Sequence, residues 1–479
     1  MTVVAATDLW RLSATELAAA ITSRQVSSRE VIEAHLRRIE AVNPSINAVV
    51  IVLAEGALAA AEAADRAAAG GSVLAPFPGV PFTIKDNIDV VGTPTTQGFR
   101  ALAAAYPSRD APIVERMKIA GAIPIGRTNL PTAAVRWHTE SELWGATINP
   151  WDPTRTPGAS SAGEAAAIAT GMSPLGLGSD GLGSLRHPAQ CCGVAALKTT
   201  LGRLPHATAL EPEYAPIGAQ LAAVAGPLAR RVADLRAAFE VMAGPSWRDP
   251  WTVPAPLRGP VLPKPLRIAL VVDPGGHGTS QQVQEGVRKA AAVLEEAGYV
   301  VDEIEPPSID QAAHALLVML STPAIREGWQ EFLSPVAPAD TRLFMSAFFE
   351  AAGHPDAMAA EQSFMIRQSV MRAWGEFQET RPLIVAPIST EPPFEAGTDL
   401  DEGRVVETIR NLRMAMAVNT LGLPAVAVPV GIRDGLPQAV QIIGPRYRED
   451  LCLDAAQAIE DRVGIFTPID PRSPGETSV

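Results

Sequence analysis

The stretch from Gly158 to Arg186 constrains the fold most, because two Gly- and Ser-containing turns enclose one helix-and-strand unit. It begins with GASSAGEAAAIATG, a small-residue turn followed by an Ala-rich helical pattern, and it ends with the turn SDGLGSLR. A helix that leaves the first turn returns through the apolar run Pro174–Gly178 as a strand. We therefore expect the pair Ser160 and Ser161 to approach Ser184 at one end of this unit.

The glycines before Ser184 have a chemical implication of their own. They leave several main-chain N–H groups free to point at one spot, which is what an anion or oxyanion site requires. A serine beside such a site indicates a nucleophile. Gly/Ser-rich segments are, however, also typical of turns that have no further role, so this stretch alone leaves both interpretations open.

Composition and charge limit the class of protein. A chain of 479 residues with 47% apolar residues buries a large core. A net charge of -13 argues against nucleic acid or an acidic membrane as a partner. Three cysteines, two of them adjacent, form neither a disulfide framework nor a metal-binding pattern. The start MTVVAATDLW has no signal-peptide pattern, and no long apolar run follows. We expect a soluble, cytoplasmic protein.

Helix and strand patterns alternate along the whole chain. Two capping boxes, Ser13–Glu16 and Ser27–Glu30, predict helix starts. Strands are predicted at Asn47–Val52, within Gly79–Gly92, and at Ala122–Gly126, Leu266–Val272, Tyr299–Ile304, Pro382–Ile388, Ala425–Val430 and Gln438–Ile443. Helices are predicted at Ala54–Ala69, Ala111–Ala120, Pro188–Leu197, Ser280–Ala297, Ile309–Thr380 and Glu449–Asp461. This alternation predicts one α/β layered domain over residues 1–479 with a largely buried sheet and a disordered tail at 471–479.

Lysine is scarce in this chain, and one lysine stands in an unusual place. Only 5 of the 39 basic residues are lysine, and Lys85 ends the apolar strand pattern Val80–Ile84. A desolvated lysine loses its proton and acts as a base, whereas arginine does not. The position therefore favours a base. The plainer alternative is an ion pair with Asp86 or Asp89.

Other hydrolytic and nucleotide-binding patterns are missing from the sequence. Neither serine cluster has the G-x-S-x-G elbow, there is no H-E-x-x-H, and the seven histidines show no ligand spacing. The segment Gly158–Gly163 has the glycine spacing of a phosphate loop, but it continues with Glu164 rather than lysine. Nucleotide binding is therefore not expected.

Taken together, these motifs resemble the amidase signature family over nearly the whole chain, from Ser13 to Asp461. Gly79–Gly92 resembles the lysine strand of the family and Gly158–Arg186 its serine-rich signature core. Three shorter segments also resemble family elements: Gly126–Asn129, Asn419–Pro429 and Gly435–Gln441. The resemblance implies a single α/β/α fold around a large mixed, mostly parallel sheet.

The same resemblance implies a Ser–cis-Ser–Lys triad. Ser184 is then the nucleophile, Ser160 relays the proton and follows a cis peptide bond from Ala159, and Lys85 is the base. It also implies an oxyanion hole and support for the loop, from the N–H groups of Gly181, Leu182, Gly183 and Ser184 and from the side chains of Ser161, Asp180 and Arg186. No metal or organic cofactor is needed for this chemistry.

Some residues depart from the family pattern. Ala159 and Ala162 replace glycines, Thr199 stands where proline is common, and Leu182 places a side chain on the oxyanion turn. None of these changes removes a catalytic group. We expect an active enzyme whose pocket shape is altered at Leu182.

The substrate is predicted in outline only. The apolar loops, the pair Trp137 and Trp144 and the Met/Phe-rich region 309–380 favour a hydrophobic or aryl amide, a carbamate (urethane) or an ester. The sequence as a whole is also similar to the urethanases of this family. The rival class is a glutamine-dependent amidotransferase subunit that works with a partner, but the segment Arg410–Val418 has no carboxylate to hold an amino-acid ammonium. A catalytically dead binding protein is disfavoured, because all three triad positions are filled. The expected state is a monomer or homodimer.

Overall fold

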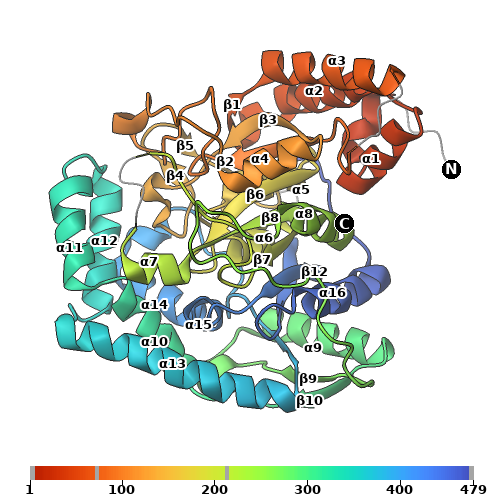
Figure 1. The fold of residues 1–479 in the computed structure, drawn as a ribbon. Coiled ribbons are helices and arrows are strands. Elements are labelled where there is room, and N and C mark those ends of the chain that lie inside the picture. Colours follow the sequence, from red (N-terminus) through yellow and green to blue (C-terminus); the bar gives the residue numbers. More distant parts are fainter. Residues whose placement is uncertain (1–5, 71–74, 211–214, 474–479) are drawn as a thin grey trace.

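A computed structural model describes residues 6–70, 75–210 and 215–473. One sheet of eleven strands runs through these residues in the order β1-β3-β2-β6-β8-β7-β12-β13-β11-β9-β10 (Figure 1). Its strands are β1 (Val49–Val52), β2 (Pro81–Lys85), β3 (Ile123–Thr128), β6 (Leu175–Asp180), β7 (Ala195–Lys198), β8 (Val224–Ala229), β9 (Arg267–Leu270), β10 (Val300–Glu303), β11 (Leu383–Ala386), β12 (Ala425–Arg433) and β13 (Leu436–Ile443). A separate hairpin pairs β4 (Glu140–Ser141) with β5 (Gly145–Ala146).

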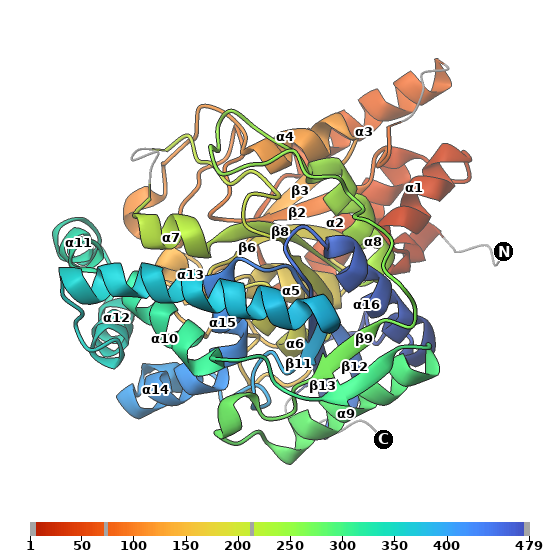
Figure 2. The same ribbon diagram turned by 60° about the horizontal axis from the view of Figure 1, so that its bottom comes forward.

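Helices cover both faces of the sheet (Figures 1 and 2). They are α1 (Ala14–Thr22), α2 (Ser28–Ile46), α3 (Ala54–Ala69), α4 (Pro112–Ile119), α5 (Ala162–Ala169), α6 (Arg186–Cys192), α7 (Ile217–Ala222), α8 (Val232–Met242), α9 (Gln281–Glu296), α10 (Ile309–Met319), α11 (Pro323–Gly328), α12 (Ala339–Ala351), α13 (Ala357–Thr380), α14 (Glu402–Asn411), α15 (Arg413–Leu421) and α16 (Glu449–Val463). Both predicted capping boxes are formed, at the starts of α1 and α2.

The sheet is mixed, and the predicted α/β layered class is confirmed. Parallel pairing joins β3, β2 and β6 in one group and β11, β9 and β10 in another. The remaining neighbours pair antiparallel, including β6 with β8 and β7 with β12. Because β2 and β6 run side by side in the same direction, their carboxyl ends lie at one edge of the sheet.

Alternating side chains give the sheet two buried faces. On β9, Ile268 and Leu270 join one apolar cluster, which includes residues of α8, α9 and α16. The intervening residue Ala269 joins a different cluster with residues of α10, α13 and α15. Successive side chains of a strand point to opposite faces, so a strand covered on both faces is apolar throughout. This arrangement explains why the strand patterns are short continuous apolar runs.

One predicted helix is wrong in part. Helix α6 ends at Cys192, and the second half of the predicted segment Pro188–Leu197 forms strand β7 instead. Gly193 ends the helix with a φ of 70°, and a Cβ there would lie 3.1 Å from atoms of Trp151 and Pro437. A glycine in the left-handed conformation is a common helix stop.

Two further features complete the outline. Strand β8, which the sequence patterns do not predict, fills the centre of the sheet between β6 and β7. No helix among the described residues is long and apolar enough to cross a membrane. Of the tail predicted to be disordered, residues 474–479 lie outside the described residues.

Candidate active site

Lys85 and Ser160 meet at the edge of the sheet where β2 and β6 end. Lys85 is the last residue of β2, and Ser160 lies in the turn that precedes α5. The Nζ atom of Lys85 donates to Ser160 Oγ over 2.7 Å. Lys85 is completely buried and Ser160 is 2% exposed. The structure therefore joins two of the three predicted triad residues in a water-poor setting.

Ser184 lies in the turn between β6 and α6, next to the first serine turn. Its carbonyl accepts from the N–H of Ser161 over 3.1 Å. Ser161 in turn donates from Oγ to the carbonyl of Ser179 over 3.2 Å. These bonds tie the two serine turns together, and the Ala159–Ser160 peptide bond is cis, as predicted. Ser184 is half-buried, so it is open to a substrate.

The environment of Lys85 suits a base. Burial lowers the pKa of Lys85 to about 7, while the negative charges of Asp180 and Glu164 oppose the shift. The amine also donates to Ser179 Oγ over 3.1 Å, and Asn87 donates to the same hydroxyl over 3.1 Å. An amine with this pKa is neutral in a large fraction of molecules at neutral pH, and a neutral amine accepts a proton.

Asp180 and Arg186 form a buried pair that holds the turn at 181–184. Asp180 accepts from Arg186 Nε over 3.0 Å and from the N–H groups of Gly183 and Leu185 over 2.8 and 3.2 Å. Burial alone would raise the pKa of Asp180, but the charge and hydrogen bonds of Arg186 bring that pKa below its ordinary value. An ionised carboxylate thus fixes the main chain around Ser184.

Arg186 is anchored to the C-terminal elements that resemble the family. It donates to Asn419 Oδ1 over 2.6 Å and to Gln441 Oε1 over 2.7 Å. Sequence patterns identify these segments but give no role to Asn419 or Gln441. The structure shows that both hold the arginine that holds Asp180.

The turn at 181–184 carries the four N–H groups that were predicted as oxyanion donors. Gly183 has a φ of 94°, a conformation that favours glycine. Its N–H donates to Asp180 Oδ1 over 2.8 Å, so this one of the four predicted oxyanion donors is already engaged. Behind the turn, a Cβ at Gly183 would lie 3.3 Å from the Cβ of Ala415 on α15.

Leu182 faces an apolar cluster between the turn and the helices α12 and α15. The side chain is half-buried against this cluster, which includes Trp137, Phe344 and Phe348. The ring centroids of Trp137 and Phe344 are 5.2 Å apart in an edge-to-face arrangement. The second tryptophan of the predicted pair, Trp144, donates from its indole to Asp86 Oδ2 over 3.1 Å.

The Met/Phe-rich region is divided between core and surface. Phe344, Met345, Phe348 and Phe349 are buried in the cluster that Leu182 joins. Met358 and Met365 on α13 are 65% and 66% exposed. The α12 part of the region therefore packs near the turn at 181–184, whereas these two methionines face solvent.

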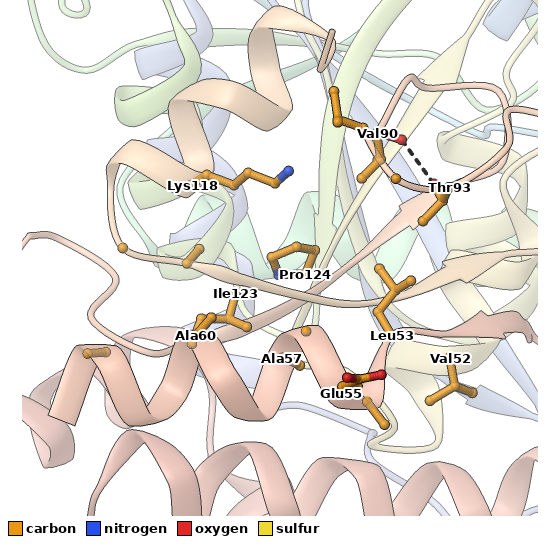
Figure 3. Close-up of a pocket in the computed structure, with 17 residues that line it drawn as sticks. Val52, Leu53, Glu55, Ala57, Ala60, Val90, Thr93, Lys118, Ile123 and Pro124 are labelled. Carbon is orange, nitrogen blue, oxygen red and sulfur yellow. Dashed lines mark hydrogen bonds between the residues drawn. The ribbon is translucent and has the colours of Figure 1, made fainter. Parts of the chain in front are cut away.

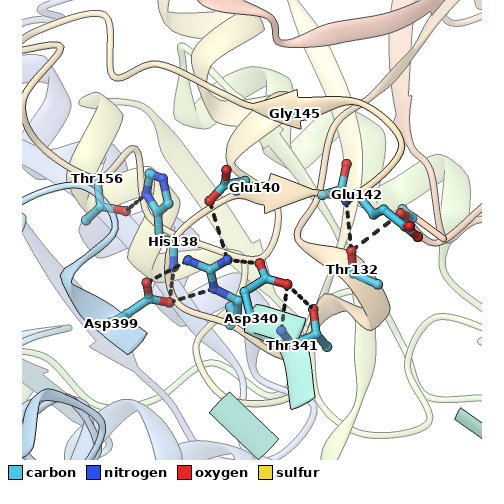
Figure 4. A network of polar contacts seen from close by, with 12 residues as sticks. Thr132, His138, Glu140, Glu142, Gly145, Thr156, Asp340, Thr341 and Asp399 are labelled. Carbon is cyan, nitrogen blue, oxygen red and sulfur yellow. Dashed lines mark hydrogen bonds and ion pairs between the residues drawn. The ribbon is translucent and has the colours of Figure 1, made fainter. Parts of the chain in front are cut away.

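A buried arginine fastens this apolar cluster to the 137–146 segment. Arg136 donates to Asp399 over 2.9 Å and also pairs with Asp340 at the start of α12 and with Glu140 (Figure 4). The main-chain N–H of His138 donates to Asp399 over 3.2 Å. The network holds α12 against the segment that carries Trp137.

Two pockets differ in their relation to these residues. A pocket of about 720 Å³ lies between α3, β3 and the loop after β2, and its described lining includes none of the predicted site residues (Figure 3). A pocket of about 600 Å³ includes Asn87 and residues 223–225 in its lining. Asn87 shares Ser179 Oγ with Lys85, so the second pocket lies beside the site.

Comparisons with known proteins agree with the resemblance. The model of the amidase family matches residues 30–453. An indoleacetamide hydrolase of Bradyrhizobium diazoefficiens is 41% identical over 96% of this chain and 88% of its own length. A glutamyl-tRNA(Gln) amidotransferase subunit from Chloroflexus aurantiacus is 31% identical over 95% of this chain and 97% of its own length.

The fold comparison gives the same result. A bacterial aryl acylamidase of the amidase signature family superposes with a TM-score of 0.81 and 26% identity, covering 94% of this chain and 96% of the other. The buried Lys85–Ser160 contact thus occurs in a chain matched to the family over most of its length. This protein belongs to the amidase family and is an amidase-signature hydrolase that acts on amides.

Proposed function

We propose that this enzyme hydrolyses the C–N bond of hydrophobic or aryl amides through an acyl-enzyme on Ser184. The observation that carries the proposal is the buried Lys85 amine, 2.7 Å from the Ser160 hydroxyl and beside the turn of Ser184. A buried lysine that donates to a serine, next to a second serine on a Gly-rich turn, has the arrangement of an activated nucleophile.

In the proposed first half-reaction, Ser184 Oγ attacks the carbonyl carbon of the amide. The proton of Ser184 passes to Ser160, and the proton of Ser160 passes to neutral Lys85. The N–H groups of Gly181, Leu182 and Ser184 stabilise the negative charge on the carbonyl oxygen. When the C–N bond breaks, a proton returns from Lys85 through Ser160 to the leaving nitrogen, so the amine departs neutral.

The second half-reaction uses the same groups with water as the nucleophile. Water adds to the acyl carbon and gives its proton to Lys85 through Ser160. The bond between that carbon and Ser184 Oγ then breaks, and the serine recovers its proton. Lys85 ends each half-reaction as it began, so no further proton donor is required.

For the substrate we propose an aryl-substituted acyl group, with arylacetamides of the indole-3-acetamide type as the first choice. The similarity to an indoleacetamide hydrolase and to an aryl acylamidase supports this class. The apolar side chain of Leu182 lies on the turn proposed to bind the carbonyl oxygen, and it packs against the cluster that contains Trp137 and Phe344. Aryl carbamates and aryl esters present the same carbonyl to the turn, and we propose them as secondary substrates.

A substrate panel tests this choice. Purified enzyme is assayed with indole-3-acetamide, an anilide, an aryl carbamate, a fatty amide, acetamide and glutamine. We expect the aryl substrates to have a higher kcat/KM than acetamide and glutamine, because each buried methylene-sized group contributes about 0.8 kcal/mol. Acetamide hydrolysed as well as the aryl amides would overturn the proposed acyl specificity.

Lys85→Arg tests the role of the base. Arginine keeps a positive charge and a long donor chain, but it does not accept a proton because its pKa stays above about 12. We expect kcat to fall by about 10²–10⁴-fold, which is the usual contribution of general base catalysis. A folded variant that retains a tenth of wild-type kcat would remove Lys85 from this role.

The second candidate is a glutamine-dependent amidotransferase component, which the similarity to the Chloroflexus protein supports. It predicts glutamine hydrolysis that a partner protein stimulates. Helix α15, Arg413–Leu421, has no acidic side chain. A kcat/KM for glutamine equal to that for an anilide would favour this candidate over the first.

A further inference from the structure

Glu164 is a buried carboxyl group that the mechanism above does not use. It lies in the first turn of α5 and is completely buried. Oε2 accepts from the hydroxyl of Thr83 over 2.6 Å, and Oε1 accepts from the hydroxyl of Thr128 over 2.7 Å. Each carboxyl oxygen therefore has its own hydroxyl donor, which is an arrangement that favours an ionised carboxylate.

The position of Glu164 is set by the strands around Lys85. Thr83 precedes Lys85 by two residues on β2, so both side chains point to the same face of the sheet. Thr128 on β3 is the register partner of Lys85. On the other side, a Cβ at Gly176 of β6 would lie 1.9 Å from Glu164 Oε2, so only glycine leaves room for the carboxyl group.

We propose that Glu164 is a positioning residue for the reaction: its negative charge keeps the buried Lys85 basic enough to take the proton from Ser160. The inference rests on the proposed function of Lys85 as the base. Burial removes the hydration that normally favours an ammonium group, so a lysine in this place becomes a weak base. A carboxylate beside it restores part of its proton affinity.

Two opposing effects act on the charge of Glu164. Burial raises the pKa of Glu164 to about 8, and the bonds from Thr83 and Thr128 and the charges of Lys85 and Arg127 oppose that shift. Because Lys85 and Glu164 are both buried and interact, they titrate together near neutral pH. Their charges are therefore coupled.

The other charged groups near the pair have partners of their own. Asp180 also faces Lys85, and it is paired with Arg186 over 3.0 Å. Arg127 faces Glu164, and it lies 3.4 Å from Asp86. His206 also lies within electrostatic range of Lys85, and its pKa is lowered below the ordinary value of histidine, so it carries no charge at neutral pH. Of these groups, Glu164 is the carboxylate near Lys85 that has hydroxyl donors in place of an arginine.

The test follows the modification of Ser184 by phenylmethanesulfonyl fluoride as a function of pH, so that no substrate has to be known. Ser184 Oγ displaces fluoride from sulfur, the S–F bond breaks, and the serine proton passes through Ser160 to Lys85. The inactivation rate therefore falls as Lys85 becomes protonated. The pH at half-maximal rate reports the proton affinity of the base.

Glu164→Gln removes the charge and keeps the shape. We expect the half-maximal pH to move to lower values by at least about half a unit, because a nearby opposite charge typically shifts a pKa by about 1–3 units. Thr83→Val removes one donor to the carboxylate and should move the half-maximal pH less, in the same direction. Adding Thr83→Val to Glu164→Gln should give no further shift.

The outcomes separate this inference from the proposed function. A folded Glu164→Gln protein with the wild-type half-maximal pH, beside a Lys85→Arg protein that reacts slowly, overturns only the role of Glu164. A Lys85→Arg protein that reacts at the wild-type rate overturns the proposed base itself. If Glu164→Gln does not fold, Thr83→Val decides: an unchanged half-maximal pH rejects the role of Glu164.

Discussion

Two completely buried lysines, Lys85 and Lys198, end two strands of the same sheet and differ in what their amines touch. Lys85 ends β2, and Lys198 ends β7. Burial is the main cause that lowers the pKa of each lysine to about 7. By burial and pKa alone, either one would be a candidate base.

The hydrogen-bond partners distinguish them. Lys85 donates to the hydroxyls of Ser160 and Ser179, which both donate and accept. Lys198 donates to the carbonyls of Thr199 and Leu423 over 3.1 and 2.7 Å, and a carbonyl has no proton to give. A lowered lysine pKa therefore indicates a base only where a neighbouring group can pass it a proton. Lys198 instead joins β7 to the chain before β12.

The largest expected effect tests whether Lys85 acts through Ser184. Ser184→Ala removes the proposed nucleophile, and we expect kcat to fall by at least about 10⁴-fold, because loss of a serine nucleophile disables the whole catalytic unit. Adding Lys85→Met to Ser184→Ala should cost little more, since residues that act as a unit are not additive. Single-turnover assays with indole-3-acetamide measure both losses. A further hundredfold loss in the double variant would show that Lys85 acts independently of Ser184.

The next effect compares the two lysines directly. Lys85→Met and Lys198→Met each remove an amine and keep an unbranched chain. We expect about a 10²–10⁴-fold loss of kcat for Lys85→Met, the usual size of a general-base contribution. For Lys198→Met we expect kcat to fall by less than about tenfold. The amine of Lys198 lies between two carbonyls, which have no proton to give it, so it takes no part in general base catalysis. Equal losses in two folded proteins would end the distinction between them.

A smaller effect is expected in the pH profile. Wild-type kcat should fall as pH drops through about 7, because Lys85 then holds a proton and no longer accepts one. Lys198→Met should keep the same midpoint, since the amine it removes is not the base. The pH profiles of kcat are measured with the best aryl amide. Circular dichroism at each pH checks that both proteins stay folded. If the midpoint moves when Lys198 is replaced, the fall of kcat at low pH is not caused by Lys85 alone, and this prediction is wrong.

Much of this site is predictable from the sequence because its key residues lie in short local patterns. Lys85 stands out as a lysine at the end of an apolar strand, and the resemblance places Ser160 and the cis bond that the structure confirms. Lys85 and Ser160 are 75 positions apart, and the structure brings them together. The roles of Ser184 and of the oxyanion donors remain predictions.

What the sequence does not show depends on contacts between distant segments. Glu164 looks like a polar residue of an Ala-rich helix, because nothing near it reveals Thr83 and Thr128 on two strands. Strand β7 is predicted as helix because a helical pattern does not show where Gly193 adopts a positive φ. Local propensity is overridden where packing across the sheet decides.

The last prediction concerns stability, in which the two lysines should behave alike. Each has a pKa lowered from 10.5 to about 7, so between these values the unfolded chain binds more protons than the folded chain. Stability then rises with pH by up to about 1.4 kcal/mol per pH unit for each lysine. Methionine does not titrate, so each variant lacks this gain in stability. The difference in stability between the wild type and Lys85→Met or Lys198→Met should therefore grow in favour of the wild type as pH rises above 7. Urea unfolding of the wild type and both variants at several pH values measures the two slopes. If both destabilisations grow equally with pH while kcat differs, burial sets the pKa of both lysines and hydroxyl partners give only Lys85 its chemistry. If the destabilisation caused by one variant does not change with pH, the lysine that it replaces keeps its proton in the folded wild type.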